Sequence, residues 1–151
     1  MTNKLDAYNK ATDRLVLQAA GYAMPEFGKF SLPEIVYLLR ESFKYKLTYK
    51  KVFDMIPDRE CNPSAGFCLV GSYYIYRAAG GAGQWKIMET PLHWWLEHKV
   101  TSGPLDITYD QFSKKYPYDM GKLESRISGD AEFENILREK AMILGRAAGL
   151  E

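Results

Sequence analysis

The stretch NPSAGFCLVGSYYIYRAAGG, residues 62–81, places a cysteine at the start of an almost wholly apolar segment. Its first five residues contain the asparagine, proline, serine and glycine that are typical of a loop. A glycine pair closes the stretch, as is common where a helix ends. The pattern predicts a helix that starts at about Phe67 and carries Cys68 in its first turn.

The thiol of Cys68 has four possible roles: packing, half of a disulfide, metal ligand or nucleophile. The chain contains only one other cysteine, Cys61. Cysteine on an apolar helix is commonly buried and inert. In a first turn, however, unpaired N–H groups and the helix dipole stabilise a thiolate. The stretch alone leaves both packing and nucleophilic chemistry open.

Length and composition indicate one ordinary globular domain. The chain has 151 residues, of which 46% are hydrophobic and 26% are charged. Its net charge of +1 provides no overall field that would attract nucleic acid or an acidic membrane. The polar N-terminus lacks a signal-peptide pattern, and no apolar run approaches the ~18 residues of a spanning helix. With only two cysteines, we expect reduced thiols and a cytoplasmic location.

The rest of the chain predicts helices on both sides of a small sheet. A capping box, Ser31-Leu32-Pro33-Glu34, opens the second of two N-terminal helices. Short aromatic-rich segments separated by turns then indicate an antiparallel meander, and a last helix follows. This order predicts an α+β fold in a single domain over 1–151. The expected elements are helices over 3–20 and 31–45, strands over 85–89, 93–98 and 105–108, and a helix over 130–147 with Phe133, Ile136, Leu137, Ala141 and Leu144 inward.

Three residues form a candidate catalytic group: Cys68, His93 and Asp106. Two adjacent antiparallel strands can place His93 beside Asp106, so that the carboxylate fixes the imidazole tautomer and the other ring nitrogen faces the thiol. Small residues one turn beyond the cysteine, Gly71 and Ser72, would let the strand of His93 approach. The alternatives are a hydrogen-bonded core histidine and a turn aspartate.

An acyl-transfer site also needs donors for an oxyanion. The backbone N–H of Cys68 is one candidate, because it lies at a helix start. The side-chain amide of Asn62, six residues upstream, is the best side-chain candidate. Since Asn-Pro often starts a turn, a purely structural role for Asn62 stays open.

Several segments resemble the YunG-like proteins and small bacteriophage proteins, which are similar to papain and transglutaminase. The similar segments are NPSAGFC over 62–68, the pair Gly80-Gly81, His93-Trp94-Trp95, LDITYDQF over 105–112 and YPYDMGK over 116–122. The resemblance implies a papain-like fold with a helical part over 1–60, a Cys-His-Asp core over 61–122 and a closing helix over 128–148.

The same resemblance implies a thiol hydrolase or acyl-transferase that cleaves an amide or peptide-like bond through a thioester, without a cofactor. Cys68, His93 and Asp106 would then form the catalytic triad of a protein from a bacterial cell or a phage-infected host. The substrate groove would include Trp94, Trp95 and Gln111. Of the two tryptophans, one should be core and the other should line this groove or cover the back of the sheet.

Two rival hypotheses concern other chemistry. A zinc site would need both cysteines together with His93 and His98, but the cysteine spacing is long and the histidines face opposite sides of a strand. A disulfide between the two cysteines conflicts with a reducing compartment. A binding protein without catalysis is the second rival. Interleaved aromatic and basic residues over 43–51 would then grip single-stranded nucleic acid through Lys44, Lys46, Lys50 and Lys51.

Overall fold

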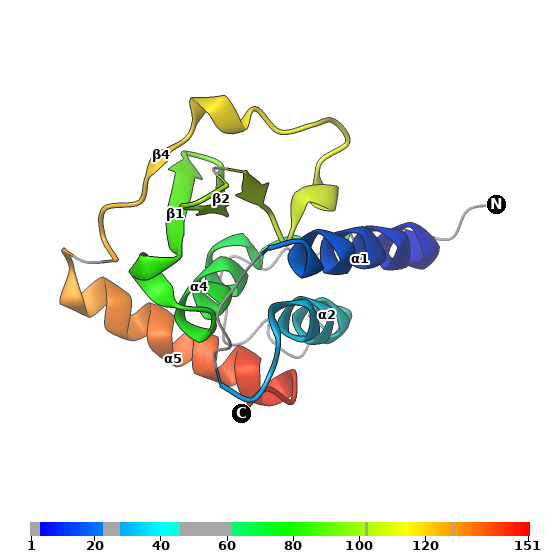
Figure 1. Cartoon of the computed structure of the whole chain (residues 1–151), viewed down its shortest axis with the longest axis horizontal. Helices are drawn as coiled ribbons and strands as arrows, with labels where there is room; N and C mark the ends of the chain where they lie inside the picture. Colours follow the sequence, from blue (N-terminus) through cyan, green and yellow to red (C-terminus); the bar gives the residue numbers. More distant parts are fainter. Residues whose placement is uncertain (1–3, 23–27, 46–61, 102, 128) are drawn as a thin grey trace.

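The computed structural model describes residues 4–22, 28–45, 62–101, 103–127 and 129–151, and the fold is of the predicted α+β class (Figure 1). A small antiparallel sheet lies beside a group of helices, and the last helix closes the chain. In chain order the described elements are α1 (Lys4–Ala20), α2 (Leu32–Phe43), α4 (Cys68–Ala78), η1 (Gly81–Gly83), β1 (Trp85–Thr90), β2 (His93–His98), β3 (Pro104–Leu105), η2 (Tyr109–Gln111), η3 (Tyr118–Met120), β4 (Lys122–Leu123) and α5 (Ala131–Ala147).

The sheet has the strand order β3-β2-β1-β4, with every pair antiparallel. The hairpin of β1 and β2 is paired along its full length, from Trp85↔His98 to Thr90↔His93. The strand predicted over 105–108 is shorter than expected, because the ladder includes only Pro104 and Leu105. After Leu105, the carboxylate of Asp106 accepts hydrogen bonds from the backbone N–H and the hydroxyl of Thr108. These bonds form a turn, so the chain leaves the sheet.

Helix α4 is the central helix, in contact with α2, α5, β1 and β2. It begins at Cys68, as predicted, and every residue from Cys68 to Ile75 is buried. An apolar surface on all sides suits a helix that is surrounded by protein. Trp85 fixes the other end of α4 by donating its Nε1–H to the carbonyl of Ala79 at 3.0 Å.

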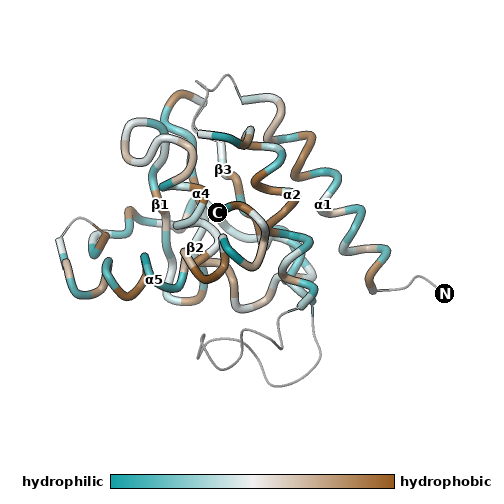
Figure 2. Tube along the Cα trace, turned by 90° about the horizontal axis from the view of Figure 1, so that it is seen from below, coloured by the Kyte–Doolittle hydropathy of each residue, from teal (hydrophilic) through white to brown (hydrophobic). Residues whose placement is uncertain are grey.

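The surrounding helices carry the expected apolar stripes. In α2 the predicted capping box is present, with Ser31 and Glu34 bonding reciprocally. Figure 2 shows hydrophobic and hydrophilic residues alternating along α1, as expected for a helix with one buried face. In α5 Leu137, Ala141 and Leu144 are buried, but Ile136 is 50% exposed, so its predicted inward position is wrong.

The close approach allowed by Gly71 is made to different partners from those predicted. A Cβ at this position would lie 3.2 Å from the Phe43 ring of α2 and 3.5 Å from the Ile107 side chain. Phe43 also stacks on Phe67 with 4.3 Å between ring centroids. The small residue therefore lets α2 and the segment after β3 pack against the first turns of α4.

Candidate functional site

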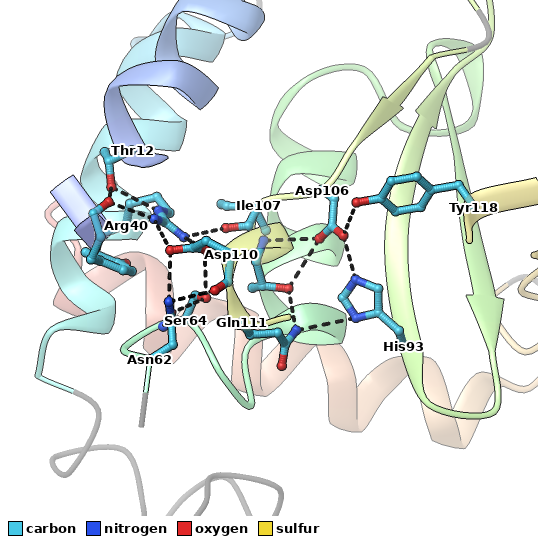
Figure 3. A network of polar contacts seen from close by, with 12 residues as sticks. Thr12, Arg40, Asn62, Ser64, His93, Asp106, Ile107, Asp110, Gln111 and Tyr118 are labelled. Atoms are coloured by element: carbon cyan, nitrogen blue, oxygen red, sulfur yellow. Dashed lines mark hydrogen bonds and ion pairs between the residues drawn. The ribbon is translucent and has the colours of Figure 1, made fainter. Parts of the chain in front are cut away.

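His93 and Asp106 form a buried hydrogen-bonded pair, as predicted. His93 is the first residue of β2, and its Nε2 lies 2.7 Å from Oδ2 of Asp106, the residue that directly follows β3 (Figure 3). The exposed fraction is 0% for His93 and 3% for Asp106. With Nε2 bonded to the carboxylate, Nδ1 is the ring nitrogen that is left for another partner.

Three further donors hold the carboxylate of Asp106 in place. The Tyr118 hydroxyl donates to Oδ2 at 2.7 Å, and the backbone N–H of Thr108 donates to Oδ1 at 3.1 Å. The Thr108 hydroxyl donates to the same oxygen at 3.3 Å. Burial and the neighbouring carboxylate raise the pKa of Tyr118, so the phenol remains a proton donor. The carboxylate of Asp106 is thus held in a fixed position against the imidazole.

Cys68 is the first residue of α4, and its thiol is one of the groups that raise the pKa of His93. The thiol is free and 8% exposed. Burial alone would lower the pKa of His93, but hydrogen bonds to Asp106 and to Cys68, together with their charges, raise it to about 9. A raised imidazole pKa favours the imidazolium, which is the form that stabilises an adjacent thiolate.

Gln111 lies at the other side of the imidazole, at the end of η2. Its Nε2 is 3.5 Å from Nδ1 of His93 and donates to the Thr108 hydroxyl at 2.9 Å. This amide is therefore close to the ring nitrogen that Asp106 does not bind. The sequence predicted Gln111 as a groove residue, and the structure brings it directly to His93.

Asn62, the predicted oxyanion donor, contacts a different carboxylate. Its Nδ2 donates to the backbone carbonyl and to Oδ2 of Asp110, each at 3.0 Å, and these bonds use both N–H groups of the amide. Its Oδ1 accepts from the backbone N–H of Ser64 at 2.8 Å, which shapes the loop before α4. The arrangement gives Asn62 a structural role, and the oxyanion role stays a prediction that this geometry does not support.

Asp110 is the centre of a polar cluster that the sequence did not predict (Figure 3). Arg40 of α2 is fully buried and donates to both carboxylate oxygens of Asp110, at 2.7 and 3.0 Å. It also donates to the carbonyl of Ile107 and to the Thr12 hydroxyl, each at 3.0 Å. Burial opposes ionisation of Asp110, but the bonds from Arg40 hold the pKa of this carboxyl below its usual range.

This cluster, Thr12, Arg40, Asn62, Ser64 and Asp110, connects two segments of the site. It ties the loop before Cys68 to the segment of residues 106–111, which carries Asp106 and Gln111. In the sequence, Arg40 directly follows Leu39 of the apolar stripe of α2. A charge at the edge of such a stripe usually reaches solvent, so the sequence does not show that Arg40 is buried or that Asp110 is its partner.

The tryptophans of β2 lie on opposite faces, as predicted. Trp95 is fully buried beside His93, with 5.7 Å between ring centroids. Trp94 faces the other way and donates to Glu124 at 3.1 Å, so it does not line a groove beside His93. Phe112 and Tyr116 cover His93 further, at centroid distances of 4.8 and 4.9 Å.

The residues of the rival hypotheses are only partly within the described chain. Lys44 pairs with Glu41 at 2.8 Å, whereas Lys46, Lys50, Lys51 and Cys61 lie outside the described residues. His93 and His98 lie at opposite ends of β2, so they are not placed to bind the same metal ion. Among the described residues, no group of three or more His, Cys, Asp or Glu side chains is placed to hold a metal ion.

Comparisons of the chain with protein-family models, curated proteins and solved structures found no match. None of the helices in the described ranges is both long enough and apolar enough to cross a membrane. What the site does chemically therefore has to follow from its own geometry.

Proposed function

We propose that the chain is a thiol hydrolase or acyl-transferase of papain- and transglutaminase-like type, acting on an amide or peptide-like bond. Cys68 is the nucleophile, His93 the general base and acid, and Asp106 the residue that orients His93. The observation that carries the proposal is the buried His93–Asp106 bond of 2.7 Å, at a histidine whose pKa is also raised by a thiol at a helix N-terminus.

The chemistry follows from these positions. The Cys68 thiolate attacks the carbonyl carbon, and the carbonyl oxygen becomes an oxyanion beside the backbone N–H groups of the first turn of α4. His93 gives the proton on Nδ1 to the nitrogen of the leaving amine, and the C–N bond breaks to leave a thioester. Water or another acceptor then gives a proton to Nδ1 and attacks the thioester, which releases the acyl group and restores the thiolate.

Gln111 is the second donor in this proposal. Its amide lies 3.5 Å from Nδ1, on the side of the ring where the proton moves. A shift of the amide away from Nδ1 as the imidazole becomes protonated would free an N–H for the oxyanion. The backbone N–H of Cys68 supplies the other donor.

An acyl-enzyme experiment tests the proposal. With p-nitrophenyl acetate we expect a burst of p-nitrophenol and an acetyl group on Cys68, found by mass spectrometry of the intact protein and its peptides. Cys61→Ser should keep the burst, and Cys68→Ser should abolish it. An acetyl group on Cys61 alone, or no burst in the folded protein, would end the hydrolase hypothesis.

One observation favours the second candidate, a binding protein without catalysis. His93 has no exposed surface, and Phe112 and Tyr116 pack against its ring. In that case His93 and Asp106 stabilise the fold, and removing the pair should cost on the order of 1–3 kcal/mol of unfolding free energy. The burst experiment with His93→Ala separates the two functions: a catalytic His93 gives a burst in the wild type that the folded variant lacks, whereas a purely structural His93 gives no burst in either protein.

A further inference from the structure

A cavity lies between α1 and the segment of residues 104–118, and Asp106 is one of the residues that line it. Its volume is about 530 Å³, within the usual range of 300–1,000 Å³ for small-molecule sites. Arg14, Gln18 and Leu15 of α1 form one side, and the loop that follows η2 forms the other. The cavity is lined by neither Cys68 nor His93, so it is separate from the place where the thiol acts.

The charges at this cavity are unbalanced. Arg14, Lys114 and Lys115 line it, and within the described part of the chain none of the three has an ion-pair partner. Two carboxylates also line it, but Asp106 accepts from His93 and Tyr118, and Asp110 is paired with Arg40. The cavity therefore presents three uncompensated cations in a chain whose net charge is only +1.

The remaining wall is aromatic. Tyr109, Phe112, Tyr116 and Tyr118 line the cavity, and the rings of Phe112 and Tyr116 lie 4.7 Å apart. Aromatic walls favour a flat apolar group, and a guanidinium with two ammonium groups favours a carboxylate. A small molecule with an aromatic ring and a carboxylate has both of these groups.

We propose that this cavity binds a small aromatic carboxylic acid, with the carboxylate at Arg14, Lys114 and Lys115 and the ring against the tyrosines and Phe112. The site includes neither the thiol nor the imidazole, although it shares Asp106 and Tyr118 with the proposed hydrolase.

Nuclear magnetic resonance titration of the whole chain with a matched pair of probes tests this site. 3-Phenylpropanoate carries the ring and the carboxylate, whereas 3-phenylpropanamide carries the same ring without the charge. We expect saturable shifts of the backbone amide signals over 113–118 with the acid. The amide should need about tenfold more for half-saturation, since it lacks the charge-assisted bonds. Propanoate, which lacks the ring, should also bind more weakly.

Charge variants locate the site. Arg14→Gln and the double variant Lys114→Gln/Lys115→Gln should each weaken binding of the acid and leave binding of the amide unchanged. Lys86→Gln, at an exposed lysine on β1, is the matched control and should bind as the wild type does. Cys68→Ser should also bind normally, so that failure of the hydrolase and failure of this site give different results. Shifts that do not saturate, equal binding of acid and amide, or unchanged binding in the charge variants would each overturn the proposal.

Discussion

The only two histidines of the chain lie at opposite ends of β2 and are equally buried, yet burial has opposite outcomes for their protons. His93 is 0% exposed and His98 is 1% exposed. Asp106 and Cys68 raise the pKa of His93 to about 9 against the effect of burial. Burial lowers the pKa of His98, which packs between Tyr22 and Trp85 with 5.0 Å to each ring centroid.

The difference shows what a carboxylate does in a closed environment. Neither ring nitrogen of His98 has a hydrogen-bond partner among the described residues. An imidazolium there would be desolvated without compensation, so the neutral ring is favoured. At His93 desolvation is offset by an oriented carboxylate. His93 at one end of β2 therefore favours the imidazolium, and His98 at the other end favours the neutral imidazole.

The largest expected effect comes from breaking the Arg40–Asp110 pair, which supports the segment that carries Asp106. Arg40→Met would leave a buried carboxylate without its cation, and we expect a loss of about 3–5 kcal/mol in the free energy of unfolding. Urea denaturation measures it. The double variant Arg40→Met/Asp110→Asn should recover most of the loss, because no charge is left unpaired and an acceptor remains for Asn62. A single variant as stable as the wild type would contradict the role given to this cluster.

Replacing the carboxylate of Asp106 should lower the pKa of His93, so that it resembles His98 in this property. In Asp106→Asn the imidazolium loses its anion, so we expect the pKa of His93 to fall from about 9 to below the ordinary 6.5. The ring-proton chemical shifts of His93, followed against pH, measure this change, and those of His98 serve as the internal control. A His93 pKa that stays near 9 in the variant would show that Asp106 is not its cause.

The two histidines should also shape the pH dependence of stability in opposite directions. The raised pKa of His93 contributes stability that is present below pH 6.5 and is lost as the pH rises towards about 9. The lowered pKa of His98 makes stability fall as the pH drops below 6.5, because the unfolded chain takes up the proton first. His93→Gln should flatten the alkaline side of the profile and His98→Phe the acidic side, measured by thermal melts from pH 5 to 9.5. If both variants had the same pH dependence of melting temperature, the opposite roles given to the two histidines would be contradicted.

Among these substitutions, Gln111→Ala should have the smallest effect on the pKa of His93. The Nε2 of Gln111 lies 3.5 Å from Nδ1, and the amide can donate to this nitrogen only when the imidazole is neutral, so the contact slightly favours the neutral form. Gln111→Ala should therefore raise the pKa of His93 a little and leave that of His98 unchanged. If Gln111 also serves as an oxyanion donor, the variant should slow acylation of Cys68 by much more than the pKa change explains, on the order of 10²-fold. Unchanged acylation would leave only the role at Nδ1.

Local signals predicted most of the fold and part of the candidate site. The capping box at Ser31, the apolar segment after Cys68 and the aromatic strands each specify an element through nearby residues. The pairing of His93 with Asp106 followed from two adjacent strands and is confirmed. The Arg40–Asp110 pair joins positions 70 residues apart, so no local pattern contains it. The exposure of Ile136 and the isolation of His98 likewise depend on which elements pack together, which a helical or strand period does not specify.

The most direct test of the central claim is the pH dependence of Cys68 alkylation by iodoacetamide in a Cys61→Ser background. If His93 and Asp106 act on the thiol as one unit, the reaction should stay fast at pH 6, well below the ~8.5 pKa of a free thiol. His93→Ala, Asp106→Asn and the double variant should then all react slowly at pH 6, with the double variant hardly slower than either single one. A wild-type rate that rises only above pH 8, and that neither substitution changes, would contradict the catalytic interpretation of the site.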